Sequence, residues 1–163
     1  ANDYGNLAQR VLSMIAKNCD AQIPTPGAFS ADDETLLSAA RGLLPKLREL
    51  LDVQTFHEAL EEIWVVIRAA NGYVDAQAPW KLRKEDPDRM ATVLYVLAET
   101  IRHLALLTQP YMPETSAKLL DQLAIASDDR DFKALEMGEG ALVPGVELPK
   151  PQGVFPRFIE EEE

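Results

Sequence analysis

The chain has 163 residues, of which 47 % are hydrophobic and 26 % are charged, as is typical of one globular domain with a sizeable core. Its net charge of −11 argues against a broad nucleic-acid-binding surface but leaves room for a small basic site. The single cysteine excludes an internal disulfide and a cysteine-based zinc site. No apolar run approaches the roughly 20 residues of a membrane span. The first residues lack the features of a signal peptide.

Apolar residues at helical spacing predict the first two elements. A first helix covers roughly residues 3–18. The run Ile23-Pro24-Thr25-Pro26-Gly27 then breaks the pattern. Ser30, followed by acidic residues, is a typical N-cap, so a second helix should run from there to about Leu51. Pro45 within this second helix predicts a kink or a split.

A third helix is predicted between two local signals. It should begin at Thr55-Phe56-His57-Glu58, which has the sequence of a capping box. It should end where Pro79, which fixes its own φ, forces Ala78 out of the helical region. The apolar side chains that we expect this helix to bury are Phe56, Leu60, Ile63, Trp64, Ile67 and Val74.

Two further helices and a non-helical arm complete the predicted fold. A fourth helix begins at Asp86-Pro87, and a fifth follows Pro113 and ends near Leu123. The rest of the chain has frequent Gly and Pro residues between short apolar runs. We therefore expect an all-α bundle of about five helices over residues 1–125, followed over residues 126–163 by a C-terminal arm with room for one short hairpin.

No catalytic constellation is visible in the sequence. A Gly-rich phosphate loop, a nucleophile elbow and a His-Glu-x-x-His motif are all missing, so no catalytic residue is assigned. His57 and His103 fall on different predicted helices without metal-ligand spacing around them, so neither a metal nor a cofactor is expected in this chain. Acidic stretches such as Asp32-Asp33-Glu34 are interpreted as solvated surface. The lack of an initiator Met indicates a piece of a longer protein, which we interpret as a binding or structural module.

Trp80 is the side chain most suggestive of a function. It follows Pro79 at the predicted corner and is itself followed by three basic residues, Lys81, Arg83 and Lys84. An aromatic ring beside cations is a suitable platform for an unstacked RNA base. The alternative is that the ring only packs over the end of the third helix.

Asn6 and Arg10 form a second candidate pair on the first helix. Because they are four residues apart, both side chains emerge on one face. An amide suits a base edge, and a guanidinium offers a planar fork to a phosphate or a base. The alternative is that both are ordinary surface side chains.

Five motifs follow one another along nearly the whole chain: Asn6-Leu7-Ala8-Gln9-Arg10, Thr55-Phe56-His57-Glu58-Ala59-Leu60, Asn71-Gly72-Tyr73-Val74-Asp75 with Ala78-Pro79-Trp80, Pro110-Tyr111-Met112-Pro113-Glu114-Thr115 and Val154-Phe155-Pro156-Arg157-Phe158. In their order and spacing, the chain resembles the C-terminal anticodon-binding domain of the bacterial methionyl-tRNA synthetases. These are class I aminoacyl-tRNA synthetases.

The resemblance implies an α-helical bundle that reads the CAU anticodon of methionine tRNAs. In the family, the Trp of the Pro-Trp motif stacks on the first anticodon base, a role that falls on Trp80, and Pro79 would set the orientation of that ring. An Asn and an Arg that contact the anticodon bases match Asn6 and Arg10. Two further matches line the same end of the bundle with less defined roles: Asn71 and Asp75.

The resemblance also implies what lies outside this chain. The parent enzyme would attach methionine to tRNA with ATP and magnesium, would be cytoplasmic and, if Glu163 is near its end, monomeric, with no membrane partner. Its catalytic domain is absent here, so this chain alone would be inactive, and the arm would fold back towards that domain. Gly72 stands where the family often has a basic residue. The alternative from another functional class is a helical protein-interaction scaffold without an RNA role, which the acidic surface and the apolar arm also suit.

Overall fold

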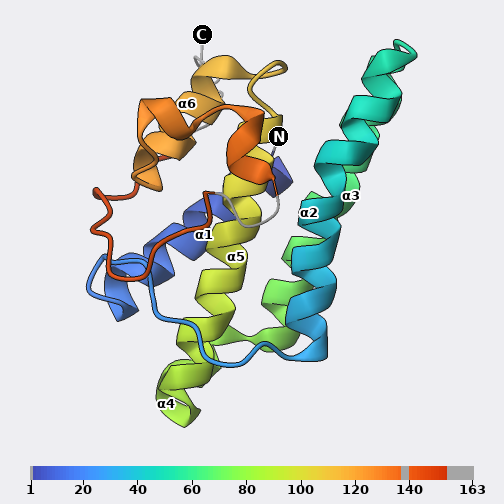
Figure 1. Cartoon of the computed structure of the whole chain (residues 1–163). Coiled ribbons are helices and arrows are strands. Elements are labelled where there is room, and N and C mark those ends of the chain that lie inside the picture. The colour runs from blue at the N-terminus through green and yellow to red at the C-terminus, as the bar shows by residue number, and fades with distance from the viewer. Residues whose placement is uncertain (1, 137–139, 154–163) are drawn as a thin grey trace, which may run out of the picture.

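The computed structural model describes residues 2–136 and 140–153, and it confirms the all-α prediction for this part of the chain. Among these residues, six α-helices are followed by two short 3-10 helices: α1 (Asn2–Asn18), α2 (Ala31–Asp52), α3 (Phe56–Gln77), α4 (Pro79–Glu85), α5 (Pro87–Leu107), α6 (Pro113–Gln122), η1 (Ser127–Asp129) and η2 (Phe132–Leu135). Figure 1 shows α2 and α3 as a long antiparallel pair beside α5.

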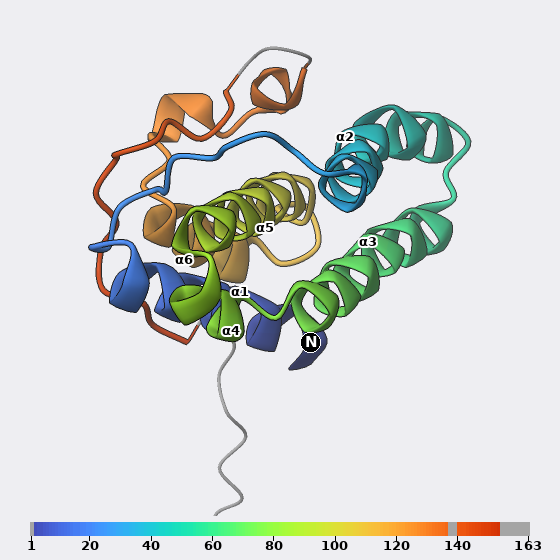
Figure 2. The same ribbon diagram turned by 90° about the horizontal axis from the view of Figure 1, so that it is seen from below.

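The core helix of the bundle is α5. It contacts α1, α2, α3, α4 and α6, and the view along the bundle in Figure 2 shows the other helices arranged around it. Contrary to the expectation from the sequence, α5 is long and apolar enough to cross a membrane by length and composition alone. Because 89 % of its most apolar window is buried inside the bundle, it is the central helix of a folded core.

Two of the predicted helix starts differ in their local chemistry. At Ser30 the capping box is complete, since its hydroxyl accepts from the backbone N–H of Asp33 and the Asp33 carboxylate accepts from the N–H of Ser30. The predicted box at Thr55 is wrong, because the Thr55 hydroxyl donates to the carbonyl of Leu50 and makes no capping bond. Of the two alternatives predicted at Pro45, a kink or a split, the split does not occur, since α2 continues through this residue.

The predicted buried face of α3 needs one correction. Phe56, in the first turn of the helix, is 59 % exposed, because the tip of the α2–α3 pair extends beyond the bundle. Ile63, Ile67 and Val74 are buried as expected, and Trp64 is partly buried with its ring edge against Tyr4. The helix therefore buries its middle and its end but not its beginning.

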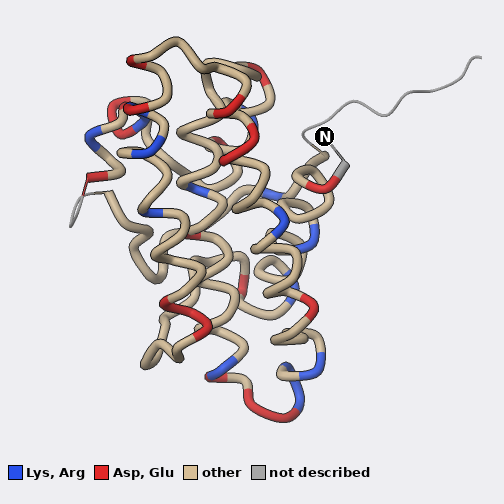
Figure 3. Tube along the Cα trace, turned by 90° about the vertical axis from the view of Figure 1, so that its right-hand side faces the viewer, with Lys and Arg blue, Asp and Glu red and all other residues tan. Residues whose placement is uncertain are grey.

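Charged residues are interleaved on the outside of the bundle. On the face that Figure 3 shows, Lys and Arg alternate with Asp and Glu, so this face does not carry one sign of charge alone. The net charge of −11 is therefore not gathered here into a single acidic surface. Such an arrangement leaves room for a local basic site despite the overall charge.

The described part of the C-terminal arm pairs with the loop after α1, and among the described residues it does not form the short hairpin for which the sequence left room. An antiparallel bridge joins Gln22 to Glu147. The backbone N–H of Ile23 donates to the carbonyl of Val146 at 2.9 Å, and that of Leu148 donates to Ala21 at 2.7 Å. The motif Val154-Phe155-Pro156-Arg157-Phe158 lies outside the described residues.

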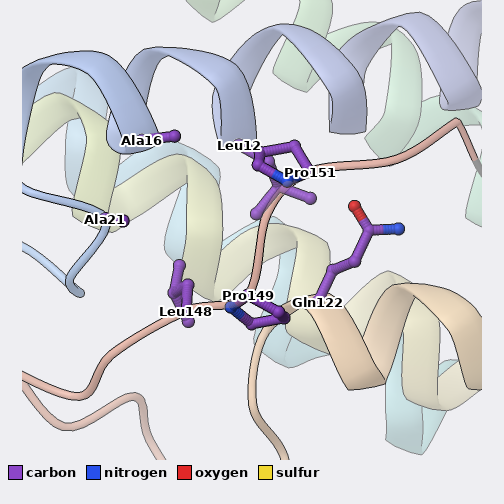
Figure 4. A pocket seen from close by; sticks show the side chains of 7 residues that line it. All are labelled: Leu12, Ala16, Ala21, Gln122, Leu148, Pro149 and Pro151. Atoms are coloured by element: carbon purple, nitrogen blue, oxygen red, sulfur yellow. The ribbon is translucent and has the colours of Figure 1, made fainter.

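Beyond this bridge, the arm covers α1. Figure 4 shows Leu148, Pro149 and Pro151 around a small hollow whose other wall is formed by Leu12 and Ala16 of α1. The N–H of Gln152 also donates to the side-chain oxygen of Gln122, at the end of α6, at 2.9 Å. The arm therefore joins the first helix to the sixth.

A buried ionic cluster on α5 fixes the start of this arm. Glu99 accepts from Arg102 Nη2 at 2.5 Å and from the N–H of Leu142 at 3.0 Å, and Arg102 Nη1 donates to the carbonyl of Ala134 at 2.7 Å. Burial acts to raise the pKa of Glu99, but the hydrogen bonds from His103 and Arg102 outweigh it and lower this pKa to about 2. The cluster thus ties two segments that follow α6 to the core helix.

Candidate nucleic-acid interface

The predicted site residues come from α1, α3 and α4, which meet at one end of the bundle. Asn6 and Arg10 are both exposed on α1, as the spacing predicts. Asp75 is exposed in the last turns of α3, and Trp80 follows in α4 with 45 % of its surface exposed. The structure therefore brings together two side chains that lie 70 residues apart in the sequence, Arg10 and Trp80.

Arg10 is the centre of this group. Its guanidinium carbon lies 5.7 Å from the centroid of the Trp80 ring, within the range of a cation–π contact. Its Nη2 lies 3.5 Å from Oδ1 of Asp75, and both side chains are well exposed, at 44 % and 70 %. Since an exposed ion pair of this kind contributes little to stability, this group is an arrangement of surface side chains and not a part of the core.

Asn71 is placed differently from the other predicted residues. Its side-chain nitrogen donates to the carbonyl of Asp3 at 3.2 Å and to that of Ile67 at 3.3 Å. Its amide N–H groups therefore join α3 to the beginning of α1. In the structure this residue connects the two helices that carry Arg10 and Asp75.

The corner before Trp80 has an unusual backbone. Ala78 ends α3 with φ 47° and ψ 61°, a left-handed conformation that is uncommon for a residue with a Cβ. As predicted, Ala78 does not have the right-handed helical conformation. A new helix, α4, begins directly after it, with the buried Pro79 as its first residue. The sequence analysis missed this seven-residue helix.

The basic residues of α4 point outward. Lys81, Arg83 and Lys84 are all exposed, and Figure 3 shows basic and acidic stretches next to each other at the end of the molecule where Figure 1 places α4. These three residues place positive charge on the same short helix as Trp80.

A polar cluster under this corner was not expected from the sequence. Asp33, interpreted as solvated surface, is fully buried, with Oδ1 accepting from Tyr73 and both oxygens accepting from Arg89. Burial acts to raise the pKa of Asp33, but the hydrogen bonds from Arg89, Tyr73 and the backbone of Ser30 lower it to about 2. The signal available in the sequence was its position three residues after Ser30, where a capping residue turns inward.

Comparisons with known proteins identify the family and the fold of this chain. Residues 23–163 match the family model described as the anticodon binding domain of methionyl tRNA ligase. The chain belongs to this family. The resemblance drawn from the five motifs is thereby confirmed, and so is the helical bundle as its fold.

Individual members of the family cover the whole chain. The methionine–tRNA ligase of Brucella suis is 49 % identical over 163 residues, which are 100 % of this chain and 31 % of that protein. The ligase of Mycobacterium tuberculosis is 48 % identical over 162 residues, covering 97 % of this chain and 31 % of its own length. The chain thus spans about a third of these relatives, and the Brucella alignment includes the α1 residues Asn6 and Arg10, which precede the part matched by the family model.

Solved structures of the family superpose closely. The crystal structure of the apo methionyl-tRNA synthetase of M. tuberculosis has a TM-score of 0.93 at 48 % identity and covers 98 % of this chain and 32 % of that one. The same synthetase in complex with methionyl-adenylate has a TM-score of 0.92 at 49 % identity, covering 96 % and 31 %. Over nearly its full length, this chain therefore has the same fold as the matching part of these synthetases.

Proposed function

We propose that this chain recognises the CAU anticodon of methionine tRNAs, with Trp80 as the stacking platform and with Asn6 and Arg10 as the base-reading groups. The observation that carries the proposal is the group of Arg10, Trp80 and Asp75, exposed at one end of a bundle of this family. Sequence-specific RNA recognition places unstacked bases on aromatic rings and forms hydrogen bonds to their edges, and this group offers an exposed aromatic ring beside hydrogen-bonding side chains.

Each side chain has a distinct part in the proposed recognition. The exposed Trp80 ring offers a π-face to an anticodon base, and Pro79 fixes the backbone that presents it. Arg10 offers a planar fork, and Asn6, one turn earlier, offers a donor and an acceptor. Asp75 holds the Arg10 guanidinium near the ring, and the basic side chains of α4 attract the phosphates around it.

The proposal extends to the whole protein of which this chain would be part. That protein would attach methionine to tRNA with ATP and magnesium, using a catalytic domain outside this chain, and residues 126–163 would dock towards that domain. It would act in the cytoplasm as a monomer. The curated relatives are methionine–tRNA ligases about three times as long as the part aligned here, which supports this extension.

The Trp80→Ala change should weaken binding of a methionine tRNA about 10- to 100-fold, because one base stacked on an aromatic ring contributes about 1–3 kcal/mol. Fluorescence anisotropy of labelled tRNA at fixed moderate salt measures this loss. Phe56→Ala, which removes an exposed aromatic side chain at the opposite end of α3, should leave the affinity unchanged.

A methionine tRNA with a changed anticodon completes the design. It should bind the unmodified chain as weakly as the normal tRNA binds the Trp80 variant. Equal affinity of the unmodified chain for both tRNAs, or equal affinity of the chain and its Trp80 variant for the normal tRNA, would rule out anticodon reading at this corner and would favour a protein-interaction scaffold.

A further inference from the structure

Arg89 closes the base of the segment that carries Trp80. It lies in the first turn of α5, and its Nη2 donates to Oε1 of Gln77, the last residue of α3, at 2.9 Å. Gln77 precedes α4 and Arg89 follows it, so this hydrogen bond joins the two ends of the segment that contains α4. A seven-residue helix is too short to be stable by itself, so its position depends on its packing against α5 and on the contacts at its base.

Arg89 is itself held by a buried carboxylate. Its Nη1 donates to Oδ2 of Asp33 at 2.5 Å, and its Nη2 donates to Oδ1 at 2.8 Å. Asp33 has no exposed surface, while 23 % of the Arg89 side chain is exposed. A bidentate guanidinium–carboxylate pair of this kind fixes both the orientation of the guanidinium and its distance from the carboxylate. The guanidinium therefore reaches Gln77 from a fixed position.

Side chains in the last turns of α3 form polar contacts on two faces of the helix. Tyr73 and Gln77, four residues apart, face the cluster, where the Tyr73 hydroxyl donates to Asp33. Asn71 and Asp75, also four residues apart, face α1 through the carbonyl of Asp3 and the guanidinium of Arg10. The cluster thus sets where the end of α3 lies relative to α1.

We propose that Arg89, seated on Asp33, is a positioning residue for RNA recognition, which acts by fixing Trp80 relative to Arg10. The inference rests on the proposed function of the corner. The physical basis is the connection between the two helices. Ala78, in a left-handed conformation, is the single residue between α3 and α4, and no side-chain capping bond fixes α4 at this point. With Gln77 and Arg89 joined, the ring is held in place before RNA arrives, so less ordering is needed on binding.

Two variants test the inference at different points. Gln77→Met removes the acceptor at the base of α4, together with a longer, exposed bond of 3.4 Å from Gln77 Nε2 to Asp32, and it leaves the pair of Arg89 and Asp33 intact. Arg89→Lys keeps the charge but cannot donate to both partners in the geometry of a guanidinium. Each should weaken binding of a CAU-bearing methionine tRNA about three- to tenfold, the loss expected for one hydrogen bond. Arg48→Met, which removes an exposed ion pair with Glu136, should have no effect.

A double-mutant cycle separates positioning from a general loss of structure. If Gln77 and Arg89 act through the ring, either change made in a Trp80→Ala background should weaken binding less than twofold further. Full additivity with Trp80→Ala would overturn the inference, and so would Gln77→Met binding as tightly as the unmodified chain. Should Arg89→Lys fail to fold, as judged by its thermal unfolding, the Gln77 variant still decides.

The same experiment distinguishes failure of the inference from failure of the proposed function. If Trp80→Ala alone leaves binding unchanged, the corner does not bind RNA and the proposed function fails. If Trp80→Ala weakens binding but the Gln77 and Arg89 variants do not, the corner binds RNA and only the positioning role is wrong.

Discussion

Replacing Glu99 by alanine should lower the free energy of unfolding by about 3–5 kcal/mol. The side chain of Glu99 is only 5 % exposed, and it compensates the charge of Arg102, which is 2 % exposed. Without the carboxylate, the guanidinium would stay buried with its charge uncompensated, and the N–H of Leu142 would lose its acceptor. Urea unfolding followed by circular dichroism measures the difference.

An exposed ion pair provides the control for this prediction. Glu136→Ala removes the partner of Arg48, where both side chains are 52 % exposed, and it should change the free energy of unfolding by less than about 1 kcal/mol. Limited proteolysis adds a second measurement, because Glu99→Ala should expose the chain around Leu142 to cleavage. Equal stability of the two variants would show that the buried cluster does not hold the arm.

Acid should destabilise the fold between about pH 5 and pH 2, and Glu99 should be the main cause. Its pKa is lowered from 4.5 to about 2 in the folded state, and that of Asp33 from 3.8 to about 2. As the pH falls, the unfolded chain therefore takes up protons first, and the stabilisation from both carboxylates, complete above about pH 5, is lost by about pH 2. For Glu99 this loss is on the order of 3 kcal/mol. Urea titrations at several pH values measure it.

The isosteric amides identify the groups responsible. Glu99→Gln and Asp33→Asn should each be less stable at pH 7 and should each show a weaker dependence on pH below 5. Asp128→Asn, which changes an exposed residue of η1, should keep the full dependence. If Glu99→Gln retained the acid dependence of the unmodified chain, its carboxylate would not be the titrating group.

Local sequence signals predicted most of the helix boundaries. Ser30 and Asp86 each cap a helix through bonds to residues three positions away, so their role is readable from the sequence. The Thr55 box was a false signal, because the hydroxyl of this residue found the carbonyl of Leu50 instead. The exposed Phe56 was mispredicted since periodicity shows which face is apolar but not how far a helix extends beyond its neighbours. The short α4 has too few residues for such a pattern.

The candidate site was predicted as a set of residues but not as a geometry. The motifs placed Trp80, Arg10 and Asp75 together by resemblance, and the structure adds the distances between them. The pair of Asp33 and Arg89 was missed because the two residues are 56 positions apart in the sequence. A carboxylate in an acidic run is usually solvated, and only the position of Asp33 three residues after the N-cap Ser30 indicated that this one turns inward.

The bridge between Gln22 and Glu147 joins two segments from almost opposite ends of the described chain. Since a ribosome releases the N-terminal part first, α1 emerges long before the residues that cover its Leu12 and Ala16 have been made. The backbone partners of the loop after α1, Val146 and Leu148, are synthesised equally late. Within this part of the protein, the arm can therefore cover α1 only well after α1 has been synthesised, and shortened chains that end before Glu147 lack the residues that make this contact.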